Sequence, residues 1–306
     1  MVLVVLAGLI WSMGGVLVRG TQGLDAWDYL GWRSAGLIVC MGLAYPAGPR
    51  ALLRAVRRQG PMGWGAAFSL ALSSLAISFA LKHTTVAFAT FLASIAPLLA
   101  VIIMATVYRE RISAGAIGCV VLGLAGIAIM VRGDFSGGQL AGNIAAALSA
   151  LGFASYSVLV NRNRGGDWFP AVWTHGWICL ALCAVAIATI GRGTVPLSPE
   201  IVLPIVHGGG IIAFGLLLYN RAARRVAPFT LIVTAQAETV FAPVWGFLVL
   251  GEVPGLSTVA GGFVIILAVV AAGLMSARDT APLALPPLAG DAAPPRPNRS
   301  DDDAPV

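Results

Sequence analysis

Long apolar stretches separated by short polar segments follow one another along almost the whole chain. Stretches such as Ala114–Met130 are apolar throughout, without the alternation of a half-buried strand. About 20 apolar residues are needed for a helix that crosses the hydrocarbon core of a bilayer. We therefore predict an all-α integral membrane protein with ten transmembrane helices. Their expected positions are residues 2–18, 28–46, 62–81, 85–107, 113–131, 143–161, 169–190, 200–220, 228–249 and 255–275.

The composition supports this interpretation. Hydrophobic residues make up 58% of the 306 residues and charged residues only 10%, whereas an ordinary soluble domain has about 25% charged residues. Residues 276–306 are different, because they are rich in Pro and Ala and contain the run Asp301–Asp303. Such a segment cannot bury enough apolar surface to fold, so we predict a disordered cytoplasmic tail.

The basic residues predict the orientation in the membrane. With the N-terminus inside, twelve basic residues fall on the cytoplasmic side and four outside. Cytoplasmic loops are enriched in Lys and Arg, so both termini should be cytoplasmic and the chain should be a multi-pass protein of the cell inner membrane. The inside set is Arg50, Arg54, Arg57, Arg58, Arg109, Arg111, Arg162, Arg164, Arg221, Arg224, Arg225 and Arg278, and the outside set is Arg19, Lys82, Arg132 and Arg192.

Two segments of the chain resemble each other. When Thr90–Glu110 is aligned with Val233–Glu252 on the final Glu, the two copies lie 142 residues apart. Each half then holds five helices, and an odd number places the second half upside down in the membrane. We predict repeats at residues 1–131 and 140–275. Inverted repeats of this kind are typical of secondary transporters, whose substrate site lies near the midplane between the halves.

The motifs around this repeat resemble the drug/metabolite transporter superfamily, specifically its EamA-type ten-helix members. The matching segments are Ala80–Pro97 (ALKHTTVAFATFLASIAP) with Glu110-Arg-Ile, and Ala237–Pro243 (AETVFAP) with Gly251–Glu252. The resemblance implies a transporter that works by alternating access, with a cavity lined by helices one, three, four, six, eight and nine. The second repeat departs from the pattern, because Thr239 stands where Pro is usual and Pro243 follows four residues later. A kink there would be shifted by about one turn.

Glu238 is the most informative single residue. It lies about eleven residues from one end of its predicted span and fourteen from Glu252, which at about 1.5 Å per residue places it near the bilayer midplane. A carboxylate at this depth is costly and marks a functional site by default. It could bind a proton or a substrate amine, or it could make a structural hydrogen bond. Gln236 is two residues away on a different face of the helix and is a second candidate for binding the substrate, since either residue could line the cavity.

Five further positions complete the predicted cavity and its possible hinge points. Ser94 lies near the depth of Glu238 in the first repeat, where its hydroxyl either lines the cavity or serves helix packing. Trp11 lies in the middle of the first span, as a packing residue or as a cavity wall that stacks on a ligand. Tyr156 could line the cavity or sit at a membrane interface, where Tyr is enriched. Pro97 and Pro243 are candidates for gating kinks, although a static bend is equally consistent with a proline in a helix.

The remaining polar residues of the spans are predicted to have mainly structural roles. Arg33 lies about five residues inside the outer end of its span, where a long side chain snorkels to headgroups, the alternative being contact with a substrate carboxylate. His175 and His207 are expected to be packing residues, and the run Gly208–Gly210 to allow close helix approach. Glu110 and Glu252 are expected to accept hydrogen bonds from the N–H groups that begin the next helix.

The resemblance implies a non-enzymatic secondary transporter of small organic metabolites, with export as the favoured direction. No G-x-x-x-x-G-K-[ST] loop occurs, so ATP does not drive it. We expect no cofactor, metal or nucleic acid, while protons could be the coupling ion and membrane lipids are obligatory partners. Amino acids are the first substrate class to test. The alternatives are an importer or uniporter of the same fold, a membrane-embedded lipid-modifying enzyme, and a channel or scaffold.

Overall fold

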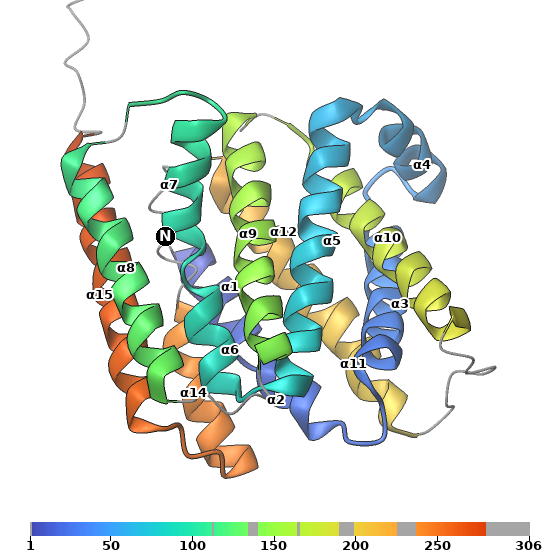
Figure 1. Ribbon diagram of the computed structural model, residues 1–306. Helices are drawn as coiled ribbons and strands as arrows, with labels where there is room; N and C mark the ends of the chain where they lie inside the picture. The colour runs from blue at the N-terminus through green and yellow to red at the C-terminus, as the bar shows by residue number, and fades with distance from the viewer. Residues whose placement is uncertain are drawn as a thin grey trace, which may run out of the picture.

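A computed structural model describes residues 2–111, 113–133, 140–163, 166–189, 199–224 and 237–279. Every regular element in these ranges is helical, and the long helices run side by side as a bundle (Figure 1). The helices are α1 (Val2–Ser12), α2 (Gly14–Gly20), α3 (Ala26–Ala44), α4 (Pro49–Arg58), α5 (Gly60–His83), α6 (Val86–Ala93), α7 (Ala96–Thr106), α8 (Ala114–Gly133), α9 (Leu140–Arg162), α10 (Phe169–Thr189), a short 3₁₀ turn (Pro199–Ile201), α11 (Val202–Val206), a π turn (His207–Ile212), α12 (Ala213–Ala223), α14 (Ala237–Leu250) and α15 (Leu256–Asp279).

The described residues contain seven helical segments that are long and apolar enough to cross a membrane, or eight if the bent pair α3 and α4 counts as one span. Three of these segments consist of consecutive elements: α1 with α2, α6 with α7, and the run from the 3₁₀ turn to α12. Two shorter apolar helices, Ala237–Leu250 and Leu256–Ala272, lie in the last two predicted spans. The all-helical, multi-spanning prediction is therefore confirmed for the described residues, while the number of ten stays a prediction.

The two halves of the chain are packed into each other rather than side by side. Helix α5 of the first half packs along α9 of the second, and α8 packs along α15 at one edge of the bundle (Figure 1). Helix α1 contacts both α12 and α14. Elements from both halves therefore meet in the centre of the molecule.

The helix ends that the sequence aligned have the same backbone geometry. Arg109 and Gly251 both adopt positive φ, of 56° and 66°, directly before Glu110 and Glu252. The N–H groups of these two Glu residues then bond carbonyls six residues back, Met104 O at 3.1 Å and Gly246 O at 3.2 Å. A residue with left-handed geometry commonly ends a helix, and Gly adopts it at least cost. The 142-residue offset thus holds in the backbone as well as in the sequence.

Helix α3 touches both α11 and the π turn that follows it, backbone against backbone. A Cβ on Gly208 would lie 1.8 Å from the carbonyl oxygen of Arg33, and one on Gly36 would lie 2.2 Å from that of Ile205. Real atoms do not approach so closely, so both positions require Gly. The glycine run therefore contributes close packing through Gly208, as expected from the sequence. By contrast, a Cβ on Gly210 would meet only a Val206 methyl at 4.0 Å.

We expect Gly208→Ala to lower the thermal stability of the detergent-purified protein, because the added methyl forces α3 and the π turn apart. Overpacking of this kind costs about 1–3 kcal/mol. Gly210→Ala is the matched control, since the same atom is added two residues away with room to fit. Equal melting temperatures for the two variants would contradict the close contact.

Candidate functional site

A cavity of about 150 Å³ lies where the two halves meet. Its walls come from α1, α2, α3, α5 and the α6–α7 break in the first half, and from α9, the π turn, α12 and α14 in the second. This volume holds on the order of ten water molecules, which is enough room for a small organic solute. Its lining mixes apolar side chains with hydroxyl, indole, imidazole, guanidinium and carboxyl groups.

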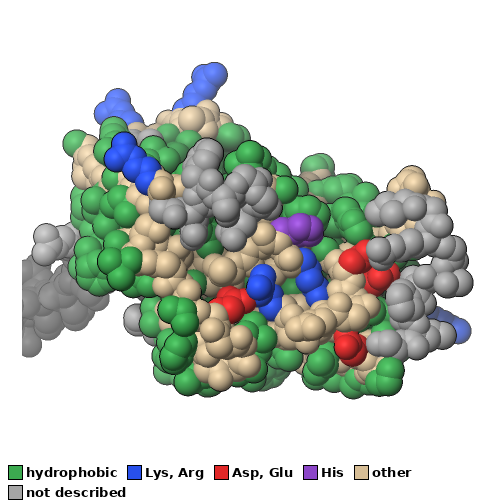
Figure 2. All heavy atoms as spheres, turned by 60° about the horizontal axis from the view of Figure 1, so that its bottom comes forward, with side chains coloured by type: hydrophobic (Ala, Val, Ile, Leu, Met, Phe, Trp, Pro, Cys, Tyr) green, Lys and Arg blue, Asp and Glu red, His purple; other side chains and the backbone are tan. Residues whose placement is uncertain are grey.

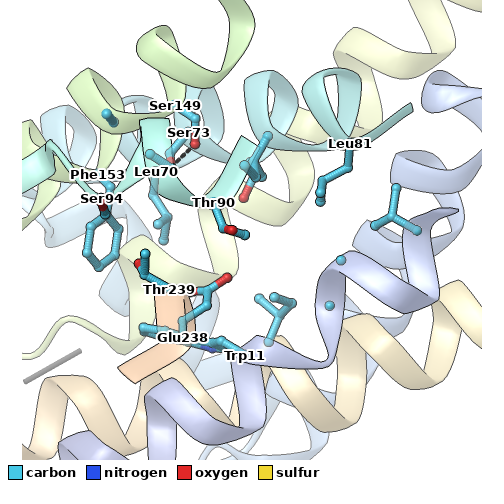
Figure 3. A pocket seen from close by; sticks show the side chains of 18 of the residues that line it. Trp11, Leu70, Ser73, Leu81, Thr90, Ser94, Ser149, Phe153, Glu238 and Thr239 are labelled. Carbon is cyan, nitrogen blue, oxygen red and sulfur yellow. Dashed lines mark hydrogen bonds between the residues drawn. The ribbon is translucent and has the colours of Figure 1, made fainter. Parts of the chain in front are cut away.

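Glu238 and its neighbour Thr239 line this cavity from the first turn of α14 (Figure 3). Among the described residues, no hydrogen bond or ion pair is formed by the Glu238 carboxyl group. A carboxylate in a membrane helix that has no protein partner is available to a proton or to a solute. Gln236 lies outside the described residues.

Hydroxyl groups also line the cavity, from α5, α6 and the α6–α7 break in the first half and from α9 in the second (Figure 3). Thr90 donates its proton to the Val86 carbonyl at 2.8 Å, and Ser94 donates to that of Phe91 at 2.6 Å. Ser73 and Ser149 share one hydrogen bond of 3.2 Å between α5 and α9. Because the protons of Thr90 and Ser94 are used within their own helix, their oxygens remain as acceptors. Together with Glu238, these side chains suit a donor-rich group such as water or ammonium.

The two prolines lie next to residues that line the cavity. The fourth predicted span breaks at Ser94 and Ile95, and Pro97 lies in the first turn of α7. Pro97 has no N–H for the carbonyl of Ala93, and Pro243 has none for the carbonyl of Thr239. Both Ala93 and Thr239 line the cavity. The helix is interrupted before Pro97, whereas α14 continues through Pro243 as one helix. A gating movement at either proline stays a prediction.

The expected aromatic lining is present only in part. Trp11 lines the cavity together with Phe153, and its indole lies against Gly215, where a Cβ would come within 2.1 Å of the indole nitrogen. Tyr156 lies behind this wall. Its side chain is fully buried and donates a hydrogen bond to Asn220 at 2.7 Å, so its hydroxyl is turned away from the cavity. Tyr156 is therefore placed in the supporting layer, not in the lining.

Arg33 is not placed as the snorkelling interpretation expected. Its side chain is only 5% exposed and lines the cavity, where it donates a hydrogen bond to the Ser74 carbonyl at 3.3 Å. The close backbone contact of Arg33 with Gly208 holds this part of α3 against the π turn, in the interior of the bundle. The sequence shows how far a residue lies from a helix end but not which way it faces, so this position was missed.

The two buried histidines differ in their surroundings. His175 is bonded on both ring nitrogens, to Val172 O at 2.6 Å and to the Ser74 hydroxyl at 3.3 Å, which fits the expected packing role. His207 lines the cavity and has Nδ1 2.8 Å from the hydroxyl of Tyr29. Its Nε2 is buried and has no hydrogen-bond partner among the described residues.

A polar network closes the end of the bundle that lies at the bottom of Figure 1. Arg19 at the end of α2 forms an ion pair with Glu252 and donates to Thr84 O at 2.6 Å. The second oxygen of Glu252 accepts from the backbone N–H of Val86 at 2.9 Å. Figure 2 shows basic and acidic side chains gathered on this face among apolar ones.

Val86 completes this closure. It is fully buried, and its side chain lies where a Cβ on Gly15 of α2 would meet it at 2.7 Å and one on Gly246 of α14 at 3.3 Å. First-half and second-half elements therefore meet tightly around one apolar residue. Glu252 does cap a helix, but that helix is α6 of the other half, not the next helix along the chain as expected from the sequence.

The opposite end of the bundle has a related ion pair. Arg162 at the end of α9 pairs with Glu110, and its guanidinium lies 3.8 Å from the centre of the Tyr108 ring. Arg19 ends the first predicted span and Arg162 ends the sixth, so they occupy equivalent places in the two repeats. In the part of the chain that the structure describes, an Arg–Glu pair at each end of the molecule joins the two halves.

A solute site between two halves of a helical bundle is a recurrent arrangement in secondary transporters. The sequence profile of the EamA-like transporter family matches residues 1–132 and 140–274. The chain belongs to this family of membrane transporters of small molecules, consistent with the drug/metabolite transporter superfamily.

Solved structures with a similar fold exist. Twenty-three chains of solved structures match. In one of them, titled only as the crystal structure of a protein, the similarity covers 90% of this chain and 97% of that chain, with 20% identity and a TM-score of 0.65. At this identity the likeness shows the fold alone. No curated protein sequence matches the chain.

Proposed function

We propose that this protein is a secondary transporter that exports small organic metabolites, amino acids first among them, across the inner membrane by alternating access. The observation that carries the proposal is the cavity between the halves, with the carboxylate of Glu238 on its wall, which has no partner among the described residues. The two halves correspond to the predicted repeats 1–131 and 140–275, with both termini and the tail 276–306 in the cytoplasm.

The charge pattern assigns the ends. The end closed by Arg19 and Glu252 faces outward in this proposal, because the loops there belong to the poorly basic set. The end with Arg162 and Glu110 faces the cytoplasm. Alternating access requires that the cavity open to one side at a time, and two ion pairs across the halves, one at each end, suit such a cycle.

Glu238 gives the cycle a coupling site. Its carboxylate can hold either a proton or a substrate ammonium group, but not both. A transporter whose one acidic site is shared in this way exchanges the two, so that proton entry drives substrate export. An importer or a uniporter of the same fold would use the same cavity without this exchange.

The function is tested by flux in proteoliposomes containing the purified full chain. Loaded with unlabelled amino acid, they should take up the same labelled amino acid by counterflow, and uptake should saturate and prefer one enantiomer. Inside-acid or outside-acid gradients then distinguish proton exchange from facilitated diffusion. Flux that rises linearly with concentration and ignores stereochemistry would point to a channel and overturn the proposal.

A further inference from the structure

Arg33 carries a full positive charge on the cavity wall without a counter-charge from the described part of the chain. Its side chain is 95% buried, and the hydrogen bond it donates goes to a neutral acceptor, the Ser74 carbonyl. An arginine guanidinium keeps its charge in proteins and presents five N–H donors. A buried ion of this kind is costly unless an opposite charge pairs with it.

The nearby acidic residues do not supply that charge. No carboxylate of the described ranges lies within 4.0 Å of the Arg33 guanidinium. Asp28 precedes it on α3 by five residues, which turns it about 140° around the helix axis. Glu238 lines the same cavity but lies beyond ion-pair distance.

Two further donors line the cavity together with Arg33. The hydroxyl of Tyr29 lies 2.8 Å from Nδ1 of His207, and we assign the hydroxyl as the donor to this nitrogen. The tautomer that results carries its proton on Nε2, and this nitrogen is buried without a partner among the described residues. The indole N–H of Trp11 is likewise buried and lacks an acceptor in the described ranges. A cation and two N–H donors without acceptors suit an anion.

We propose that Arg33 and His207 form a subsite for the carboxylate of the transported solute. Arg binds planar carboxylates through two parallel hydrogen bonds. A phosphate dianion would call for more than the one cation that the described lining offers. Since Glu238 lines the same cavity and suits an ammonium group, the substrate is a zwitterion such as an amino acid. This inference rests on the proposed function and specifies its substrate class.

Three related ligands separate the contributions of the two charged ends. L-phenylalanine has both groups, 2-phenylethylamine lacks the carboxylate and 3-phenylpropanoate lacks the amine. An aromatic ring suits the cavity because Trp11 and Phe153 line it. Binding is measured by thermal stabilisation of the purified full chain in detergent. The wild type should bind L-phenylalanine more tightly than either truncated ligand.

Substitutions of Arg33 and Glu238 should weaken the binding of different ligands. Arg33→Gln should weaken binding of L-phenylalanine and 3-phenylpropanoate by at least about 30-fold and leave 2-phenylethylamine unchanged. Glu238→Gln should weaken L-phenylalanine and 2-phenylethylamine instead. Arg33→Lys keeps the charge without the paired donors and should fall between. Retained binding of 2-phenylethylamine by Arg33→Gln shows that this variant is folded.

Several results would overturn the subsite: wild-type binding of the amine as tight as that of the amino acid, no wild-type binding of any of the three, or full binding of L-phenylalanine by Arg33→Gln. The wild-type comparison decides the matter even if Arg33→Gln does not fold. Failure of the transporter function is distinguishable, because carboxylate-selective binding without any flux in proteoliposomes would overturn transport and leave the subsite standing.

Discussion

Glu238→Gln should reduce amino-acid flux by about 100-fold or more, while the protein is still made and remains monodisperse. Removing one charge of a buried pair costs about 2–5 kcal/mol, and each 1.4 kcal/mol is a factor of ten. Gln has nearly the shape of Glu but neither releases a proton nor neutralises an ammonium group. The loss should therefore come from charge, not from packing, because no described residue bonds the Glu238 side chain.

The kind of loss identifies what Glu238 does. If it carries the coupling proton, Glu238→Gln should still catalyse exchange of labelled for unlabelled substrate but fail to respond to a pH gradient. If it holds the substrate amine, exchange should be lost as well. Glu238→Asp keeps the charge on a shorter side chain and serves as the matched control. Flux at the wild-type level in Glu238→Gln would remove Glu238 from the transport cycle.

Breaking the two ion pairs should have opposite effects on access to the cavity. Ile77 lines the cavity with an apolar side chain, so Ile77→Cys in a background without Cys40, Cys119, Cys179 and Cys183 provides a reporter. Glu252→Gln should raise its reaction rate with an impermeant thiol reagent added from outside. Glu110→Gln should lower that rate, because the cytoplasmic end then opens more readily.

The outer pair should matter more. The Glu252 side chain is 15% exposed, whereas that of Glu110 is 48% exposed. Solvent-exposed pairs contribute about 0.2–1 kcal/mol, so Glu110→Gln should change the rate by about fivefold at most. The more buried outer pair should exceed this range, at about tenfold. Equal rates in both variants and the parent would show that neither pair controls access.

The sequence was sufficient for the parts of the fold that depend on hydropathy and local capping. The apolar stretches predicted the helices, and the aligned Glu110 and Glu252 predicted helix ends that share their backbone geometry. Only part of the proposed site could be predicted from the sequence. Glu238, Ser94 and Trp11 line the cavity as predicted. They could be found because polar or aromatic residues in the middle of a span stand out in an apolar sequence.

Arg33, His207 and Tyr156 show that hydropathy does not reveal the direction in which a side chain faces. Which way a side chain faces depends on how its helix is rotated, and that rotation is set by contacts with distant residues. Arg33 faces inward because the backbone of α3 touches Gly208, 175 positions further along the chain. Tyr156 faces outward from the cavity because Asn220 accepts its hydroxyl proton. Neither contact has a local sequence signal.

The helix end that the two repeats share carries different backbone strain in each of them. Gly251 takes a left-handed backbone conformation without steric penalty, but Arg109 takes it at a cost of about 1–2 kcal/mol because its Cβ crowds the following carbonyl. A rearrangement that frees Arg109 releases this strain, and no comparable release exists at Gly251. In the proposed orientation Arg109 lies at the cytoplasmic end, so a movement that relaxed its backbone would favour opening there, and the empty carrier would then rest ready to receive its solute from inside the cell.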